Sequence, residues 1–382
     1  MINSKLPNIG TSIFAVMSKM AEEHQAINLS QGFPDFQCSE ELIELVNSYM
    51  RKGFNQYAPM PGVLALREAI AEKTEFLYGA KYDPETEITV TAGATQALFT
   101  AITAFVSEGD EVIIFEPAYD SYVPAIKLNG GQPVYIEMKT PDFSIDWEDV
   151  RKAINSRTRM IILNTPHNPT GSVLSEQDFE KLSRLVSGTK IIILSDEVYE
   201  HIIFDDLKHH SISKFAKLND RCLVISSFGK TYHTTGWKLG YCLAPIDLMK
   251  EFRKVHQFTV FAVNTPIQWA IAEFLKHREN YMELGKFYQT KRDYFINLLS
   301  GSKYKIVPAK GTYFQLLDYS EITDEQDKDF ATRITKSFGV ASIPISSFYH
   351  DSIKHKNLRF CFAKSDKILE QAADKLLHVT HK

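Results

Sequence analysis

Two lysines that lie eight residues apart, Lys230 and Lys238, occur in the segment SSFGKTYHTTGWKLGY at 226–241. The segment contains the end of the apolar run at 222–226, which is typical of a buried strand. A lysine set among glycine and small hydroxyl residues at the end of such a strand can form an imine with a carbonyl compound. The second lysine can hold an anionic group on the same ligand. The pair therefore indicates a covalently held, phosphorylated aldehyde cofactor.

An acid and a tyrosine follow another apolar run. Asp196 comes directly after residues 191–195, and Tyr199 follows three positions later. Carboxylates are rarely buried without a partner, and α/β sheets bind ligands where their strands end. Taken alone, Asp196 is equally well explained as a cap of a helix or turn, and Tyr199 as a packing residue. Beside a pyridine ring, Asp196 would keep the ring nitrogen protonated, which makes the ring an electron sink, and Tyr199 would hydrogen-bond a ring oxygen.

Two loops also follow strand-like runs. NTPHNPTG at 164–171 is made rigid by its prolines and glycine and can present the amide of Asn168, although such a side chain can instead bond its own backbone. TAGATQ at 91–96 leads into a helix, so its first N–H groups can bind phosphate. This turn has neither the GxGxxG nor the GxxxxGK[ST] pattern, so it predicts neither a dinucleotide nor a nucleoside triphosphate site.

Arg359 lies inside the apolar run LRFCF at 358–362. A guanidinium in a buried strand needs an anionic partner, and a carboxylate is the ion that it binds best, through two parallel hydrogen bonds. The partner is either a substrate carboxylate or, as the alternative, an acidic side chain in a structural salt bridge.

The elements that must position these residues alternate between strand and helix. Helices are predicted at 63–78 and 94–106, and seven short strands at 88–91, 111–115, 133–138, 160–164, 190–195, 222–226 and 239–244. Several of these runs are apolar throughout, as expected when helices cover both faces of a sheet. The pattern predicts an α/β domain whose mainly parallel sheet is sandwiched by helices.

The last third of the chain predicts a smaller α+β domain. A helical region at 266–299 precedes strands near 304–307, 312–317, 340–344 and 358–363 and a final helix at 367–379. The apolar spacing at 13–20 predicts an amphipathic helix, which can join this domain.

Composition excludes several classes of protein. The 382 residues include 43 Lys and Arg against 47 Asp and Glu, a net charge of −4, without a long basic block, so neither nucleic acid nor a membrane surface is an expected partner. No apolar run approaches the roughly 20 residues that span a bilayer, and no secretory signal is evident. The four cysteines (Cys38, Cys222, Cys242, Cys361) lack metal-ligand spacing. We expect a soluble cytoplasmic protein with free thiols and no metal site.

In this order, the segments resemble the pyridoxal-phosphate-dependent aminotransferases of fold type I, class I/II. The motifs that carry the resemblance are QGFPDF at 31–36, NQYAPMPG at 55–62, TAGATQALF at 91–99, NTPHNPTG at 164–171, SDEVYEH at 195–201, SSFGKTYHTTGWKLGY at 226–241 and LRFCFAK at 358–364. They span nearly the whole chain. Within the family the chain looks most similar to bacterial methionine aminotransferases and to kynurenine/glutamine transaminases. It departs from the latter at 94–95, Ala-Thr, where kynurenine transaminases more often have a glycine and an aromatic residue.

The resemblance implies that most of these residues bind pyridoxal 5′-phosphate. Lys230 would hold the cofactor as an imine and shuttle the proton, and Asp196 would pair with the ring nitrogen. The phosphate would be bound by four residues: Ala94, Thr95, Ser227 and Lys238. Three further residues would contact the ring, at its hydroxyl group or on its face: Asn168, Tyr199 and Tyr119.

The remaining implied roles concern substrate and assembly. Arg359 would hold the substrate α-carboxylate, with help from Asn168 and the backbone of Gly32. Phe14 would close the side-chain pocket. Tyr57 would reach the phosphate or substrate region of a neighbouring subunit, which implies a homodimer. The implied large domain is 46–275, and residues 1–45 with 276–382 form a small domain that closes over the substrate.

The activity implied is transfer of an amino group from an amino acid to a 2-oxo acid by a ping-pong mechanism. No second arginine occurs in a motif that would bind a dicarboxylate side chain, so methionine, aromatic amino acids, kynurenine and glutamine rank above aspartate. A carbon–sulfur β-lyase is an alternative, because the same cofactor chemistry can expel a β-leaving group. A cofactor-sensing regulator is a second one, but it would carry a DNA-binding domain ahead of the family-like sequence, which here starts at Ser4.

Overall fold

A seven-stranded sheet with the order β2-β8-β7-β6-β5-β3-β4 forms the centre of the computed structural model, which describes residues 3–7, 9–351 and 355–379. The strands are β2 (Ile88–Thr91), β3 (Glu111–Glu116), β4 (Gln132–Glu137), β5 (Thr158–Asn164), β6 (Ile192–Asp196), β7 (Cys222–Ser227) and β8 (Gly240–Leu243). Strand β8 is antiparallel to both of its neighbours, and the other neighbouring pairs are parallel. The mainly parallel seven-stranded sheet predicted from the sequence is confirmed.

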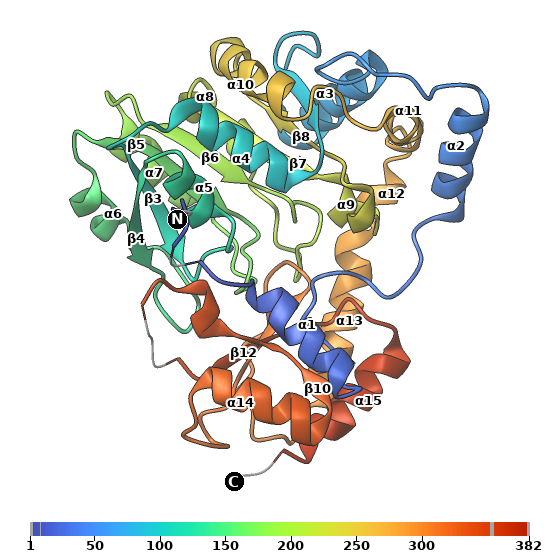
Figure 1. The fold of residues 1–382 in the computed structure, drawn as a ribbon, viewed down its shortest axis with the longest axis vertical. Helices are drawn as coiled ribbons and strands as arrows, with labels where there is room; N and C mark the ends of the chain where they lie inside the picture. The colour runs from blue at the N-terminus through green and yellow to red at the C-terminus, as the bar shows by residue number, and fades with distance from the viewer. Residues whose placement is uncertain (1–2, 8, 352–354, 380–382) are drawn as a thin grey trace.

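Helices cover both faces of this sheet (Figure 1). One face packs against α4 (Ala94–Phe105), α5 (Tyr122–Leu128) and α10 (Ile246–Thr259). The other packs against α3 (Leu64–Tyr78), α6 (Trp147–Ala153), α7 (Glu176–Val186), α8 (Ala216–Asn219) and α11 (Thr265–Phe274). Because successive strand residues point to opposite faces, Ile114 is buried in the first core and Ile113 in the second. This is why the strand runs are apolar throughout.

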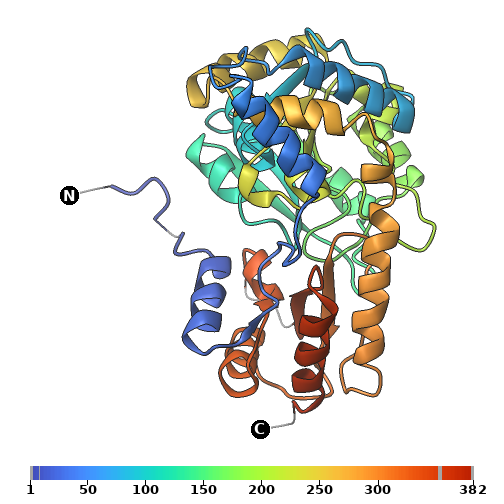
Figure 2. The same cartoon turned by 90° about the vertical axis from the view of Figure 1, so that its right-hand side faces the viewer.

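The C-terminal part of the chain forms a second, smaller sheet with its own helices beside the large sheet (Figures 1 and 2). It has an antiparallel sheet, β11 (Ile343–Pro344), β12 (Asn357–Cys361) and β9 (Phe314–Asp318), and the helices α13 (Leu284–Leu298), α14 (Asp327–Arg333) and α15 (Asp366–Leu377). The N-terminal segment joins it, since β1 (Ile27–Asn28) pairs with β10 (Val340–Ala341). The predicted amphipathic helix is α1 (Ile13–Glu23), capped by the side chain of Ser12.

The remaining elements are short or connect the two parts. They are α2 (Glu40–Arg51), which packs on α11, α9 (Phe228–Thr231), α12 (Glu279–Met282), the 3₁₀ turns η1 (Ile212–Lys214), η2 (Thr235–Trp237) and η4 (Ile345–Phe348), and the π turn η3 (Ile334–Phe338). No helix in the described ranges is long and apolar enough to cross a membrane.

Two sequence predictions are wrong. The helical region at 266–299 is not continuous but is divided into α11, α12 and α13; at the first break, the carbonyl of Phe274 accepts the backbone N–H of His277 in a tighter turn and also the side-chain amide of Asn280. The strand expected near 304–307 is only an isolated bridge between Lys305 and Asp318. Beyond it, the side chain of Gln315 takes the carbonyl of Val307, so no ladder extends there.

Candidate active site

The strand ends that carry the sequence motifs meet at one edge of the large sheet. Asn164 at the end of β5 is in register with Asp196 at the end of β6, and the next strand, β7, ends beside it at Ser227. Ser227 is opposite Gly240 at the start of β8, which in turn is opposite Thr91 at the end of β2. Motifs more than a hundred residues apart therefore share one edge, where α/β sheets bind ligands.

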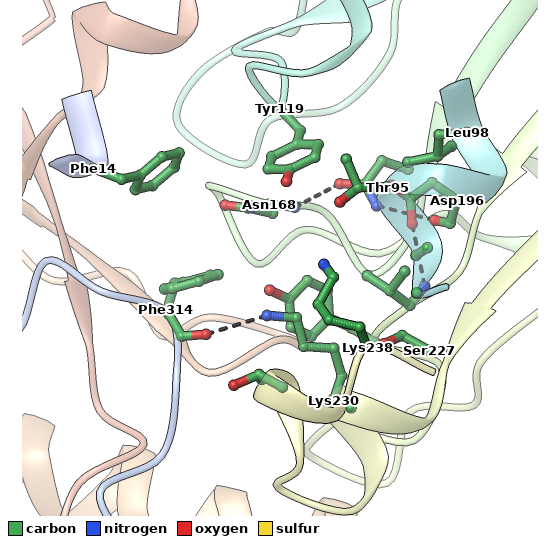
Figure 3. A pocket seen from close by; sticks show the side chains of 18 of the residues that line it. Phe14, Thr95, Leu98, Tyr119, Asn168, Asp196, Ser227, Lys230, Lys238 and Phe314 are labelled. Atoms are coloured by element: carbon green, nitrogen blue, oxygen red, sulfur yellow. Dashed lines mark hydrogen bonds between the residues drawn. The ribbon is translucent and has the colours of Figure 1, made fainter. Parts of the chain in front are cut away.

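A cavity of about 230 Å³ opens at this edge (Figure 3). Twelve of the thirteen residues predicted from the sequence line it: Phe14, Gly32, Ala94, Thr95, Tyr119, Asn168, Asp196, Tyr199, Ser227, Lys230, Lys238 and Arg359. The thirteenth, Tyr57, lies outside it and is 84% exposed, with its ring against the edge of Phe261 at a centroid distance of 5.5 Å. Its predicted role in a neighbouring subunit stays a prediction.

Asp196 places a buried carboxylate at the floor of the cavity. Tyr122 donates a hydrogen bond of 2.6 Å to Oδ2, and the backbone N–H of Val198 donates one of 3.3 Å to Oδ1. The side chain of Asn164 holds the backbone carbonyl of Asp196 at 3.0 Å. Burial raises the pKa of Asp196 to about 6, despite these hydrogen bonds. A cationic group placed opposite the carboxylate would offset that burial, so the site is suited to a protonated ring nitrogen.

Lys230 is the amine of the site, on the short helix α9 that follows β7. Burial, together with the positive charges of Arg359 and Lys238, lowers the pKa of Lys230 to about 8. Its Nζ donates hydrogen bonds to Tyr313 Oη at 2.8 Å and to the carbonyl of Gly32 at 3.2 Å. Such an amine is partly neutral near pH 7, as a nucleophile or a general base must be.

The start of α4 and Lys238 form a cradle for an anion. Gly93, the N-cap of this twelve-residue helix, has a φ of 77°, and a Cβ there would lie 3.3 Å from Cε of Lys238 and 3.4 Å from its Nζ. Glycine thus leaves the space between the helix N-terminus and the ammonium group open. Ser227 precedes α9 without capping it through its side chain, so its hydroxyl is available to a ligand. Within the described ranges, no carboxylate forms an ion pair with Lys238.

These three features together fit pyridoxal phosphate. The cavity offers an amine of lowered pKa for the aldehyde, a buried carboxylate for the ring nitrogen and an anion cradle for the phosphate, all on one strand edge. Tyr199, buried next to Lys230, and Tyr119 add a hydroxyl group and an aromatic face.

Arg359 is a buried cation bound only by neutral groups. Its side chain is on β12, and it donates hydrogen bonds of 2.8 Å from Nη1 to Asn168 Oδ1 and from Nη2 to the carbonyl of Ser30. Its buried Nε has no partner, and no acidic side chain in the described part of the chain lies within ion-pair distance. Burial lowers the pKa of Arg359 to about 10. The alternative of a structural salt bridge is therefore wrong, and an anionic ligand is what would balance the charge.

Aromatic rings surround this guanidinium. Its Cζ lies 3.8 Å from the ring centroid of Phe314, 5.1 Å from that of Phe14 and 5.3 Å from that of Phe348. Sequence reasoning missed Phe314, Phe348 and also Tyr313, because an aromatic residue at the start of a strand or turn is most simply explained by packing. The site thus joins one buried cation, which has no acidic partner among the described residues, to an apolar, aromatic wall.

Comparison with known proteins agrees with this geometry. The family "Aminotransferase class I and II" matches residues 24–376. The chain is 51% identical to the methionine aminotransferase of Escherichia coli K12, covering 98% of this chain and 97% of that one. It is 34% identical to the kynurenine–oxoglutarate transaminase of Dictyostelium discoideum, with 97% and 94% covered. The crystal structure of YbdL from Escherichia coli, reported to have a methionine aminotransferase function, has a TM-score of 0.97 at 50% identity and covers 98% and 99% of the two chains.

Proposed function

The chain belongs to the class I and II aminotransferases, which depend on pyridoxal phosphate, and we propose that methionine is its preferred amino donor. Other apolar and aromatic L-amino acids, with kynurenine and glutamine as further candidates, would donate more slowly. The acceptor is a 2-oxo acid, and the two half-reactions follow one another in a ping-pong sequence.

The cofactor would be held by residues already brought together in the cavity. Asp196 would pair with the ring nitrogen, and Lys230 would bind the aldehyde carbon. Tyr119, Asn168 and Tyr199 would contact the ring. The phosphate would accept hydrogen bonds from the N–H groups of Ala94 and Thr95 and from the side chains of Ser227 and Lys238. When bound, the cofactor supplies an electron-withdrawing ring that stabilises the charge left on the substrate carbon after its proton is removed.

Lys230 would act as the general base. Its pKa of about 8 leaves part of the amine neutral at pH 7, and this fraction can take the proton from the substrate Cα. The ammonium group that results is then the acid that returns a proton later in the same half-reaction.

The observation that carries the substrate proposal is the unbalanced charge of Arg359. Its guanidinium is 1% exposed and has no acidic partner among the described residues, so a substrate α-carboxylate fits there. The described residues that line the cavity include three cations, and Lys230 and Lys238 already have roles with the cofactor. Among the described residues, no further cation lines the cavity for a second carboxylate, whereas Phe14 and Phe314 suit an apolar side chain. This favours methionine over aspartate.

A stopped-flow screen of single half-reactions tests the proposal. Purified holoenzyme is mixed with each amino acid, and the loss of the cofactor absorbance band ranks the donors directly. Methionine should be fastest; aspartate as the fastest donor would refute the proposal. Pyruvate and ammonia released from a cysteine conjugate without any oxo acid would instead favour the β-lyase alternative. The Lys230→Ala variant should show no multiple turnover.

We also propose a homodimer in which Tyr57 completes the partner's site. Tyr57, Phe258 and Phe261 are 84%, 88% and 50% exposed, and the rings of Tyr57 and Phe261 are in contact. Exposed aromatic groups of this kind mark interaction surfaces. In each subunit, residues 46–275 would form the large domain, and residues 1–45 with 276–382 the small, substrate-closing domain. The proposed boundary falls within α2, which packs on α11.

We propose the cytoplasm as the location of the enzyme. All four cysteines are free thiols, and Cys222, Cys242 and Cys361 are buried. Free thiols persist in a reducing compartment.

A further inference from the structure

Tyr313 contacts the reactive amine directly, although the family roles transferred above do not include it. Tyr313 directly precedes β9 and is 0% exposed. Its Oη lies 2.8 Å from Nζ of Lys230. The same Oη bonds the carbonyl of Gly32, and Nζ of Lys230 lies 3.2 Å from that carbonyl. The amine, the phenol and the carbonyl therefore form a closed triangle at the wall of the cavity.

The direction of each hydrogen bond follows from counting hydrogens. A carbonyl only accepts, so the single hydrogen of Tyr313 Oη is donated to Gly32. Oη then has no hydrogen left to donate to Lys230 and can only accept through its lone pairs. Nζ must therefore be the donor to Tyr313. Burial raises the pKa of Tyr313 well above its ordinary value, so the phenol stays neutral and gives no proton to the amine.

This arrangement fixes the rotation of a neutral lysine amine. A neutral amine has two hydrogens and one lone pair in a tetrahedral arrangement. When Tyr313 Oη and the carbonyl of Gly32 take the two hydrogens, one direction is left for the lone pair. Lys230 lines the cavity, and the phenol and the carbonyl hold it from the side of β9 and of the QGFPDF segment. With only one acceptor, the amine would rotate and its lone pair would sample other directions.

We propose that Tyr313 is a further catalytic residue. Together with the carbonyl of Gly32, it orients the free amine of Lys230 so that the nitrogen lone pair points into the cavity. The proposal rests on the proposed role of Lys230 as the general base. In the proton transfer, the Cα–H bond breaks, its electron pair stays on carbon, and an N–H bond forms at Nζ. Tyr313 exchanges no proton and instead accepts a hydrogen bond from the amine before the transfer and from the ammonium group after it.

The Tyr313→Phe variant removes one acceptor, and Tyr288→Phe is its matched control. Tyr288 is also 0% exposed, its ring lies 5.6 Å from that of Tyr313, and its Oη has no hydrogen-bond partner among the described residues. In single-turnover half-reactions with methionine, Tyr313→Phe should slow proton removal by roughly tenfold to a hundredfold, since small misplacement of a base has effects of this size. The half-saturating methionine concentration should stay within about twofold, and the α-deuterium isotope effect should rise. Tyr288→Phe should match the unmodified enzyme.

A second readout needs no turnover. In holoenzyme whose cofactor is in its amine form, Lys230 is free, and its rate of alkylation by acrylonitrile can be followed by peptide mass spectrometry as a function of pH. The charged groups around this amine are Asp196, Lys238 and Arg359, and the titratable groups beside it include the thiol of Cys361 and the phenol of Tyr199, whose ring centroid lies 5.6 Å from Nζ. Loss of an acceptor destabilises the ammonium form, so the midpoint in Tyr313→Phe should fall by about one pH unit. A purely structural role would leave it unchanged.

The outcomes separate this inference from the proposed function. If Lys230→Ala turns over repeatedly, the role of Lys230 as the general base is refuted, and the role of Tyr313 in orienting its amine is refuted with it. If Lys230 is essential but Tyr313→Phe behaves like Tyr288→Phe in rate, isotope effect and alkylation midpoint, only the role of Tyr313 is refuted. Should Tyr313→Phe not fold, Tyr313→Met, with a flexible side chain that fills irregular space and carries no oxygen, is expected to give the same three changes.

Discussion

Arg359 and Asn168, 191 positions apart in the chain, are joined by a hydrogen bond of 2.8 Å from Nη1 to Oδ1. Arg359 belongs to β12 of the small sheet, and Asn168 to the loop that follows β5 of the large sheet. The bond therefore links the residue proposed to hold the substrate carboxylate to a loop proposed to contact the cofactor ring. The bonds to Asn168 and to the carbonyl of Ser30 start from Nη1 and Nη2, and the buried Nε, which has no partner among the described residues, is left for an anion.

From this geometry we expect Arg359→Lys to lose most substrate binding. An ammonium group cannot keep the bonds to Asn168 and Ser30 and also bind a carboxylate through two parallel hydrogen bonds. KM should rise about a hundredfold for methionine and for its oxo acid alike, as expected for loss of a bidentate, charge-assisted contact. Steady-state kinetics measure this. Arg221→Lys is the control, because that guanidinium bonds backbone carbonyls outside the cavity; equal losses in both variants would contradict the assignment.

Asp196→Asn should have opposite effects on the empty protein and on the holoenzyme. The pKa of Asp196 is raised on folding from 3.8 to about 6, so its contribution to stability is present below pH 4 and is lost as the pH rises through 6. Without cofactor, the variant should be more stable than the parent by up to about 3 kcal/mol at pH 8, and the gain should shrink steadily toward pH 4. Urea unfolding at several pH values measures this.

The same variant should retain cofactor poorly, because a neutral amide cannot balance a protonated ring nitrogen. Equilibrium dialysis against pyridoxal phosphate checks this second effect. An Asn variant that is both less stable when empty and unchanged in cofactor affinity would show that Asp196 is no more than a turn cap.

The exposed aromatic residues Tyr57, Phe258 and Phe261 predict a concentration-dependent dimer. Phe258→Glu places a charge where an apolar ring is 88% exposed, and it should shift the protein toward monomer in light scattering by burying an unpaired charge at the interface. Cofactor retention should fall with it, since Tyr57 of the partner would no longer reach the site. Leu377→Glu on α15, 42% exposed in the parent, is the control and should leave the dimer intact.

The part of the site on the large sheet was predictable because its polar residues directly follow apolar runs. Asp196 and Ser227 end two neighbouring strands, and parallel strands bring their ends to one edge whatever the loops between them do. Lys230 follows within one turn of a helix. Local pattern and sheet topology together were enough to place these side chains.

The contacts from the small sheet were not predictable in the same way. Tyr313 touches Lys230 only because β9 folds against the large sheet, and Phe348 touches Arg359 only because η4 packs beside β12; no local pattern records either contact. Each looks like a packing residue in its own segment. The break after α11 was missed for a related reason, since the chain turns there through the bonds of His277 and Asn280 to the carbonyl of Phe274, without any proline or glycine to mark it.

A buried ion pair lies next to the active-site helix α9: Nζ of Lys73 is 2.6 Å from Oε1 of Glu200. Tyr78, Ser226 and Tyr241 also donate hydrogen bonds to the same carboxylate, at 2.7, 2.9 and 3.1 Å. Burial alone would raise the pKa of Glu200, but the charge of Lys73 and these bonds hold it below its usual value. Lys73 ties Glu200, the residue that follows Tyr199, to α3, and Ser226 ties it to β7.

Lys73→Met should destabilise the protein by about 3–5 kcal/mol at pH 7, because it leaves Glu200 buried and uncompensated. Since the pKa of Glu200 is lowered on folding, the contribution of the pair is present above pH 4.5 and is lost as the pH falls, so the difference between parent and variant should narrow in acid. Urea unfolding across this range gives the values. Replacing both partners, Lys73→Met with Glu200→Gln, should recover part of the loss, since the amide oxygen can accept a bond from one of the hydroxyl groups of Tyr78 and Ser226 and the amide NH2 can donate a bond to the other. A double variant as unstable as the single one would mean that Lys73 acts through packing and not through its charge.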